Sequence, residues 1–191
     1  MELLSIFSAF GLSASAGLNA YIPLLVVGVL AHYTDLIKLQ SPWDTLANPW
    51  ILLMLGILLI IEMLADKIPA VNHLNDLIQT LVRPAAGAIA FAASTKVVTG
   101  IHPVVALACG LLVAGGVHIV KSAAVRPAVT AVSGGMANVP VSIAEDIVST
   151  VVSLMAIIVP VLIGTLLIIA LALLLWWWWR RSERQAYTQR R

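Results

Sequence analysis

The chain has 191 residues, of which 61% are hydrophobic and only 10% are charged, and its mean hydropathy is +1.01. Soluble domains carry about 25% charged residues, so this composition excludes a water-soluble fold, whereas a bilayer accepts an apolar outer surface. The formal net charge of +2 is small. The sequence therefore predicts an integral membrane protein.

Four helical segments are predicted in the first half of the chain. Residues 3–31 are interrupted by glycine, asparagine and proline, and we expect an uncleaved span there because no basic residue precedes it. A second span covers residues 50–66. In residues 70–81 apolar positions recur at helical spacing among polar ones, which predicts a short amphipathic helix lying at the membrane interface. A short, Ala-rich span follows at residues 84–98.

The second half holds three more segments and a tail. Residues 103–120 form a span. Residues 127–141 are Gly-rich and polar, so two interpretations stay open: a crossing span, or a broken or re-entrant element covered by protein or a wet cavity. Residues 147–179 are long for one span, contain the kink-forming Pro160, and end in four tryptophans that suit the interface. Residues 180–191 form an Arg-rich cytoplasmic tail.

Together these segments predict an all-α fold, a polytopic membrane helix bundle of about six spans within a single transmembrane domain, residues 1–179. Six crossings place the loops that carry Lys67, Arg83, Lys121 and Arg126 on the same side as the Arg-rich tail. That distribution satisfies the positive-inside rule, so we expect both termini to be cytoplasmic.

Two passages, residues 56–85 and 110–128, share a glycine followed by apolar residues, then a lysine, then Val-Arg-Pro-Ala. They indicate an internal repeat in which the amphipathic helix is an insertion. Transporters often contain repeats whose broken helices face a central site. The alternative is that Arg-Pro is simply a common way to begin a helix at the membrane surface.

Glu62 is the residue most costly to place in a bilayer, because a charge at the centre of a span costs about 2.5–3.5 kcal/mol on insertion scales. Asp66 lies one turn later on the same helix face, next to Lys67. These residues predict a proton or cation site, or a counter-charge for a substrate. The alternative is a structural ion pair with another span. In the repeat alignment, His118 and Lys121 come close to Glu62 and Asp66.

Two further groups of residues are candidates. A basic cluster at one membrane face predicts a phosphate-bearing lipid as ligand, because arginine binds phosphate in a bidentate way and basic pockets between spans hold anionic headgroups. Anchoring by positive-inside charges is the alternative. The cluster comprises Lys67, Arg83, Lys121 and Arg126. The polar residues predicted to line a cavity are Asn19, Tyr21, Asp76, Asn138, Glu145 and Asp146.

The motifs of soluble enzymes and nucleotide-binding proteins are absent: there is no Gly-rich loop with Gly-Lys-Ser/Thr, no CxxC, no HExxH and no nucleophile elbow. We therefore expect no catalytic residue, no cofactor and no metal site. The expected partners are membrane lipids, and either further copies of the chain or a larger membrane complex. No nucleic-acid partner is expected.

Several motifs occur in order and at characteristic spacing along the chain. They are Gly17-Leu-Asn-Ala-Tyr-Ile-Pro-Leu-Leu25, Glu62, Asp66-Lys-Ile-Pro69, Asn75-Asp76, Ala114-Gly-Gly116, His118, Lys121, Arg126, Ser133-Gly-Gly135, Asn138-Val-Pro140 and Glu145-Asp146. With them the chain resembles the bacterial membrane family catalogued as domain of unknown function 4126, over nearly its whole length except the tail. The resemblance implies a compact, multi-pass protein of the inner membrane, and it implies no activity or substrate.

The residues favour a small transporter or flippase-like permease for an anionic or phosphate-bearing amphiphile, proton-coupled through Glu62 and Asp66. The alternative is a non-transporting subunit or assembly factor in a larger membrane complex, which the Gly- and Ala-rich spans would suit. An intramembrane lipid-modifying enzyme ranks third, because no nucleophile–base pair is visible.

Overall fold

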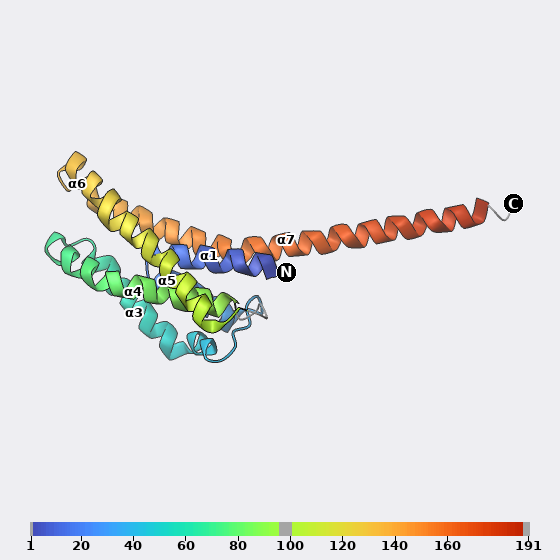
Figure 1. The fold of residues 1–191 in the computed structure, drawn as a ribbon, viewed down its shortest axis with the longest axis horizontal. Helices are drawn as coiled ribbons and strands as arrows, with labels where there is room; N and C mark the ends of the chain where they lie inside the picture. The colour runs from blue at the N-terminus through green and yellow to red at the C-terminus, as the bar shows by residue number, and fades with distance from the viewer. Residues whose placement is uncertain (1, 96–100, 189–191) are drawn as a thin grey trace.

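The computed structural model describes residues 2–95 and 101–188. These residues form helices joined by turns, with no strand among them, so the predicted all-α bundle is confirmed (Figure 1). The α-helices are α1 (Glu2–Leu18), α2 (Tyr21–Tyr33), α3 (Pro49–Ala65), α4 (Pro69–Thr95), α5 (Pro103–Val120), α6 (Arg126–Ser133) and α7 (Asn138–Thr188). A 3₁₀ helix, η1 (Trp43–Ala47), precedes α3, and a π-helical turn, η2 (Lys121–Val125), joins α5 to α6.

Helix α1 packs against α4, α5 and α7. The Ser13 hydroxyl donates to the carbonyl of Gly110 on α5 at 2.7 Å. On the α7 side, the Ser15 hydroxyl lies 2.7 Å from that of Ser149. Towards α4, the rings of Phe10 and Phe91 meet edge to face with centroids 5.0 Å apart. The N-terminal helix is therefore fixed by residues far along the chain, from α4, α5 and α7.

Small residues allow this close packing. A Cβ on Gly110 would clash with the Gly87 carbonyl and would lie 2.6 Å from the Phe91 Cβ. A Cβ on Gly17 would lie 2.6 Å from the Ala114 carbonyl oxygen. Gly116, by contrast, faces open space. In α5, Gly110 is therefore required for a close helix contact within the chain, and Gly116 is not.

The first predicted span is broken at a single point. Helix α1 ends at Leu18, and α2 begins at Tyr21. The Asn19 side-chain oxygen accepts hydrogen bonds from the backbone N–H of Tyr21 at 3.0 Å and of Ile22 at 3.2 Å, as a helix cap does. Pro23 does not interrupt α2, because it lies in the first turn, where backbone N–H groups have no intrahelical acceptor. The missing N–H of proline therefore removes no helical hydrogen bond.

The predicted interfacial helix 70–81 and residues 84–95 of the predicted span 84–98 form one helix, α4, with Pro84 inside it, and residues 96–98 of that span lie outside the described residues. The polar stripe of α4 faces the protein: Asn75, Gln79 and Arg83 are buried, with Arg83 only 1% exposed. Whereas most of the alanines and Phe91 of the C-terminal half of α4 are buried, the large apolar residues of its N-terminal half face outwards, and Leu81 is 78% exposed. This is the reverse of a helix in a soluble protein, and it is the arrangement that lipid requires. The prediction of an interfacial helix was wrong because polar partners for the stripe lie inside the bundle.

The predicted segment 127–141 is not a single helix. Helix α5 continues through the π turn into α6, and the chain then reverses at Gly134 and Gly135, whose φ angles are 61° and 91°. Glycine adopts this left-handed conformation without steric cost. Helix α7 then begins at Asn138, nine residues before the predicted start of the last span, and continues beyond Trp179 into the predicted tail.

The two passages of the predicted repeat have different folds. In the first, the chain reverses between Lys67 and Arg83, at the turn that joins α3 to α4. In the second, Lys121 and Arg126 belong to one continuous helical run. Pro127 accounts for the π turn there, because it has no N–H and its ring crowds the carbonyl four residues earlier. The shared pattern is therefore a local one and not a structural repeat.

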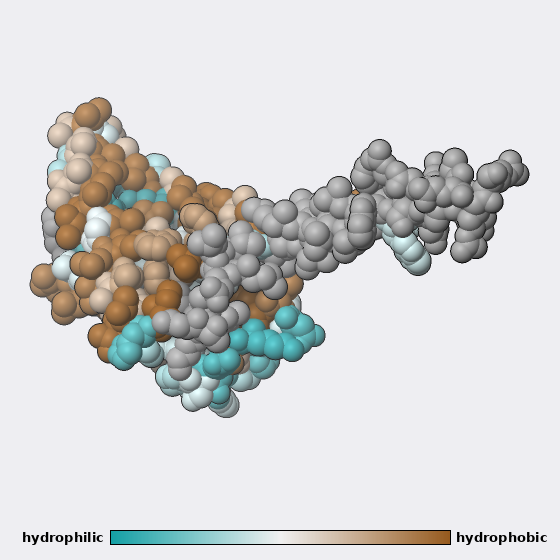
Figure 2. Space-filling view, turned by 45° about the vertical axis from the view of Figure 1, so that its right-hand side comes forward, coloured by the Kyte–Doolittle hydropathy of each residue, from teal (hydrophilic) through white to brown (hydrophobic). Residues whose placement is uncertain are grey.

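The structure supports the assignment to a membrane. Among the described residues, three stretches are long and apolar enough to cross a bilayer: Leu74–Ser94, Pro103–Ser133 and Asn138–Pro160. Shorter apolar helices cover Ser5–Leu18, Tyr21–Tyr33 and Pro49–Ala65. Figure 2 shows hydrophobic residues over most of the coloured surface of the bundle, with hydrophilic ones gathered along its lower edge. Helix α7 extends far beyond the other helices (Figure 1).

Candidate functional site

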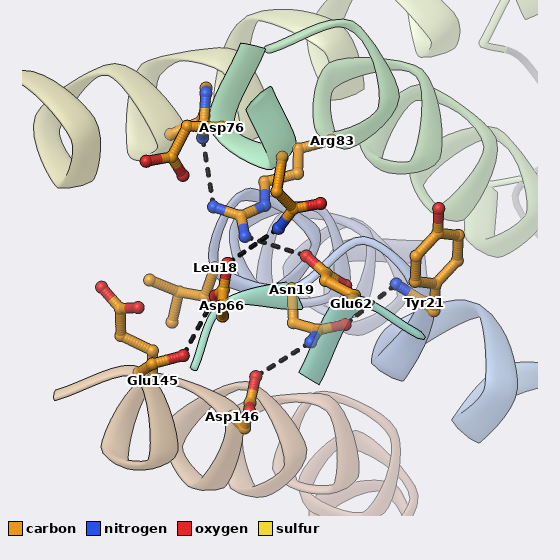
Figure 3. Close-up of polar contacts among 12 residues, drawn as sticks. Leu18, Asn19, Tyr21, Glu62, Asp66, Asp76, Arg83, Glu145 and Asp146 are labelled. Carbon is orange, nitrogen blue, oxygen red and sulfur yellow. Dashed lines mark hydrogen bonds and ion pairs between the residues drawn. The ribbon is translucent and has the colours of Figure 1, made fainter. Parts of the chain in front are cut away.

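Charged side chains from several helices converge where α1 breaks from α2. Figure 3 shows them pointing toward one another between α3, α4, α7 and the broken pair of helices. We call this group the ionic network. It comprises Glu62, Asp66, Asp76, Arg83, His118, Lys121, Arg126, Glu145 and Asp146. Buried charges are costly unless they are paired and hydrogen bonded, so removing one partner of a pair below would leave the other charge uncompensated.

At the inner end of the network, Glu62 and Arg83 form an ion pair of 2.8 Å, with both side chains only 1% exposed. Arg83 Nη1 also lies 3.2 Å from His118 Nδ1. The other His118 ring nitrogen, Nε2, lies 3.1 Å from the Thr80 hydroxyl. That hydroxyl in turn donates to the Asp76 backbone carbonyl at 2.8 Å.

These contacts determine the protonation state of His118. A guanidinium can only donate hydrogen bonds, so His118 Nδ1 must accept from Arg83. The proton of the neutral ring is then on Nε2, from which it donates to Thr80. The geometry therefore assigns His118 as a neutral imidazole of the Nε2–H tautomer.

At the outer end, one guanidinium is surrounded by three carboxylates. Arg126 contacts Asp66 at 2.9 Å, Asp76 at 3.0 and 3.1 Å, and Glu145 at 3.6 Å. We call these three carboxylates the carboxylate cage. Its Asp66 member also accepts from Asn75 at 2.7 Å and from Ser142 at 3.0 Å. The side chain of Asp76 is 25% exposed and that of Arg126 is 13% exposed, so the network opens to the outside at this end.

Two residues connect the helix break to the network. Lys121 donates to the Leu18 carbonyl at 2.9 Å, at the end of α1, and forms an ion pair of 2.8 Å with Glu145. The Asn19 amide donates to Asp146 at 2.9 Å. A cation therefore meets the C-terminal end of α1, as the helix dipole favours. The Asn19 side chain caps α2 and binds α7 at the same time.

Three buried polar atoms at the inner end have no hydrogen-bond partner within the part of the chain that the structure describes: Glu62 Oε2, Gln79 Oε1 and Arg83 Nε. Such atoms are rare in folded proteins and need a physical explanation. Two of the three, Glu62 Oε2 and Gln79 Oε1, are acceptors. The inner end therefore has spare capacity to accept a hydrogen bond or a proton.

The network has an excess of negative charge. Its five carboxylates are those of Glu62, Asp66, Asp76, Glu145 and Asp146, and its three fixed cations are Arg83, Lys121 and Arg126. With all five carboxylates ionised and His118 neutral, the five negative and three positive charges leave a formal excess of two negative charges. This excess is opposite in sign to the basic cluster that the sequence predicts.

Most of the predicted site residues lie together in the structure. All but three of those named from the sequence belong to the network or, like Asn19, contact it directly. Tyr21 follows the helix break, and its backbone N–H donates to the Asn19 side chain at 3.0 Å. Lys67 is exposed and forms no ion pair among the described residues, and Asn138 instead accepts from Thr130 at 3.1 Å near the α6–α7 turn.

The sequence interpretation missed four uncharged polar residues that lie beside the ionic network: Asn75, Gln79, Thr80 and Ser142. The first two precede Arg83 at intervals of four residues, so one polar stripe at helical spacing contains all three. That spacing was the available signal. No group of three or more His, Cys, Asp or Glu side chains within the described ranges is arranged to hold a metal ion.

Comparison with known proteins gives one match. A family model described as Domain of unknown function (DUF4126) matches residues 6–180. No curated protein and no solved structure matches the chain.

Proposed function

The chain belongs to the DUF4126 family, and we propose that it is a small proton-coupled membrane transporter in which Glu62 carries the coupling proton. One observation carries this proposal. The Glu62 side chain is 1% exposed, pairs with Arg83 through Oε1 only, and leaves Oε2 without a hydrogen-bond partner in the described structure. A carboxylate that served only to pair with arginine would engage both oxygens, since the guanidinium fork suits bidentate binding.

The shape of the network supports transport. It extends from the partly exposed Asp76 and Arg126 to the sealed pair of Glu62 and Arg83. It also adjoins a broken helix, and transporters bind their substrates and coupling ions at such breaks. Ionisable residues within membrane helices are by default candidates for a pathway of this kind.

Two expectations from the sequence receive less support. The basic residues Arg83, Lys121 and Arg126 are each paired with carboxylates, so an anionic or phosphate-bearing amphiphile would have to displace an acidic side chain. The small residues that suited a packing subunit contact other helices of the same chain, as at Gly17 and Gly110. A proton-coupled carrier therefore accounts for more of the geometry.

The location is part of the same proposal. We place the protein in the inner membrane as a multi-pass chain, with both termini on the cytoplasmic side. The support is the Arg-rich end of the chain, because basic residues near membrane helices are retained on the cytoplasmic side.

Reconstituted vesicles test the proposal. Protein is inserted into vesicles of phosphatidylethanolamine and phosphatidylglycerol that contain a trapped pH-sensitive dye, and solutes are added outside under an imposed pH gradient. In wild-type vesicles a transported solute should change the internal pH. In Glu62→Gln vesicles the solute-driven change should be lost. Asp44→Asn, which alters an exposed carboxylate outside the network, should behave as wild type.

Because Glu62→Gln leaves Arg83 without its charged partner, a second variant guards against misfolding. Glu62→Gln combined with Arg83→Gln restores charge balance but still lacks the carboxyl group. It should be monodisperse and inactive. Solute-driven proton movement in either folded variant would contradict the assignment of Glu62.

A further inference from the structure

We propose that the substrate carries a guanidinium group, and that this group binds in the carboxylate cage of Asp66, Asp76 and Glu145, which Arg126 fills in the present structure. This inference rests on the proposed transport function and names the class of its substrate. It also reverses the sign of the ligand charge that the basic residues of the sequence favour.

The cage is built around a planar cation. Arg126 Nη1 lies 3.0 and 3.1 Å from the two oxygens of Asp76, and Nη2 lies 2.9 Å from Asp66 and 3.6 Å from Glu145. Glu145 also pairs with Lys121 at 2.8 Å, so three carboxylates face two cations and one formal negative charge of the cage is left over. The spacing suits a fork-shaped cation and not a metal ion, for which no arrangement of ligands exists in the described residues.

A second observation lies deeper in the network. Glu62 Oε2 is buried and has no partner in the structure as described, and Figure 3 shows the Glu62 side chain directed toward Arg83 within the group. It offers a negatively charged acceptor beyond the cage. Together with the excess of two negative charges, it makes the interior of the network a place that attracts a cation and disfavours an anion.

The helix geometry around Arg126 would allow its guanidinium to leave the carboxylate cage. The backbone N–H of Arg126 bonds to the Lys121 carbonyl, which is the five-residue interval of a π turn. Pro127 follows, and it donates no backbone hydrogen bond. Such turns are rare and frequently lie at functional sites. Helix α6 can therefore bend at this turn and withdraw the guanidinium, so that Arg126 acts as a tethered competitor of the substrate.

The test uses three small probes that share a methyl group: methylguanidinium, methylurea as its neutral isostere, and methyl phosphate as an anion. Binding to purified wild-type protein in detergent is measured by calorimetry at constant ionic strength. Proton movement is measured in the dye-loaded vesicles. Methylguanidinium should bind and change the internal pH, and methylurea and methyl phosphate should do neither.

A variant sharpens the comparison. Arg126→Ala removes the competitor, so methylguanidinium should bind with a dissociation constant about tenfold lower than for wild type. Lys67→Ala removes the same charge at an exposed position outside the network and should leave binding unchanged. If Arg126→Ala does not fold, Arg126→Lys, which keeps the charge but loses the fork, should show a smaller gain in affinity.

The outcomes separate the two proposals. Binding of methylguanidinium without proton movement would support the cation site and refute proton coupling. Proton movement driven by methyl phosphate, and lost in Glu62→Gln, would support coupling and overturn the cation site. Equal binding of methylguanidinium and methylurea, or no gain in Arg126→Ala over Lys67→Ala, would also overturn the cation site.

Discussion

Arg83 Nη1 lies 3.2 Å from His118 Nδ1, so the arginine uses a neutral histidine as a hydrogen-bond acceptor inside the protein. The same guanidinium holds Glu62 at 2.8 Å. Arg83 therefore joins α3 to α5 across α4. The burial of the Arg83 guanidinium therefore depends on both acceptors, the carboxylate and the imidazole. Four predictions test these and other contacts of the bundle.

The first prediction concerns His118. His118→Ala should lower the free energy of unfolding by about 1–3 kcal/mol, because a buried donor of Arg83 then has no partner. His118→Asn should cost less, since its side-chain oxygen can replace Nδ1 as acceptor. Chemical denaturation in detergent measures both. Equal losses for the two variants would show that Arg83 does not depend on an acceptor at this position.

The second prediction concerns the pair of Glu62 and Arg83. Breaking a buried ion pair from one side costs about 3–5 kcal/mol, because the remaining charge is uncompensated. Glu62→Leu and Arg83→Met should each have an effect of that size. The double variant should recover much of the loss, because replacing both charges by apolar groups is often neutral. Additive losses in a double-mutant cycle would contradict direct coupling.

The third prediction compares two glycines of α5. Gly110→Ala should destabilise the protein strongly, because the new methyl group would clash with the Gly87 carbonyl and lie 2.7 Å from the Ala88 Cα, and backbone cannot move aside cheaply. Gly116→Ala should be neutral or stabilising by up to about 1 kcal/mol, because that position is open and alanine favours helix. Thermal unfolding in detergent distinguishes them. A loss at Gly116 equal to that at Gly110 would mean that α5 packs on another face.

The fourth prediction tests the packing of α1 on α7. The Ser15 and Ser149 hydroxyls are 2.7 Å apart, so cysteines at these positions should form a disulfide under mild oxidation in a chain that carries Cys109→Ser. Intact mass should fall by two hydrogens. The pairing of Ser15→Cys with Thr150→Cys, on the exposed side of α7, should remain reduced. Oxidation of both pairs alike would contradict the packing.

Local signals in the sequence were sufficient for the helices that begin with caps. Helix α3 starts at Pro49 after Asn48, whose side chain accepts from the Trp50 N–H, and α5 starts at Pro103 after His102 in the same way. Both helices lie within a residue of their predicted bounds. The start of a helix with an N-cap followed by proline depends on only a few neighbouring residues, so the sequence alone is enough to place that start.

The orientation of α4 could not be predicted in this way. A stripe of Asn75, Gln79 and Arg83 opposite a stripe of leucines is compatible with a helix at the interface and with one that turns its polar side into a bundle. The choice depends on partners such as Glu62 and Asp66, which belong to another helix. The sequence predicted the proximity of these carboxylates to His118 and Lys121 from a repeat alignment that the fold does not share. Their pairing could not be predicted, because it depends on the tertiary structure.

The break between α1 and α2 also has a consequence for the order of assembly. Lys121 meets the Leu18 carbonyl from 103 residues further along the chain, and Asp146 meets Asn19 from 127 residues further along. A ribosome delivers the broken helices first and these two partners much later. Until then the open backbone groups and the Asn19 amide need water or other cellular components as temporary partners. The segment synthesised first is thus completed only after most of the chain has been made.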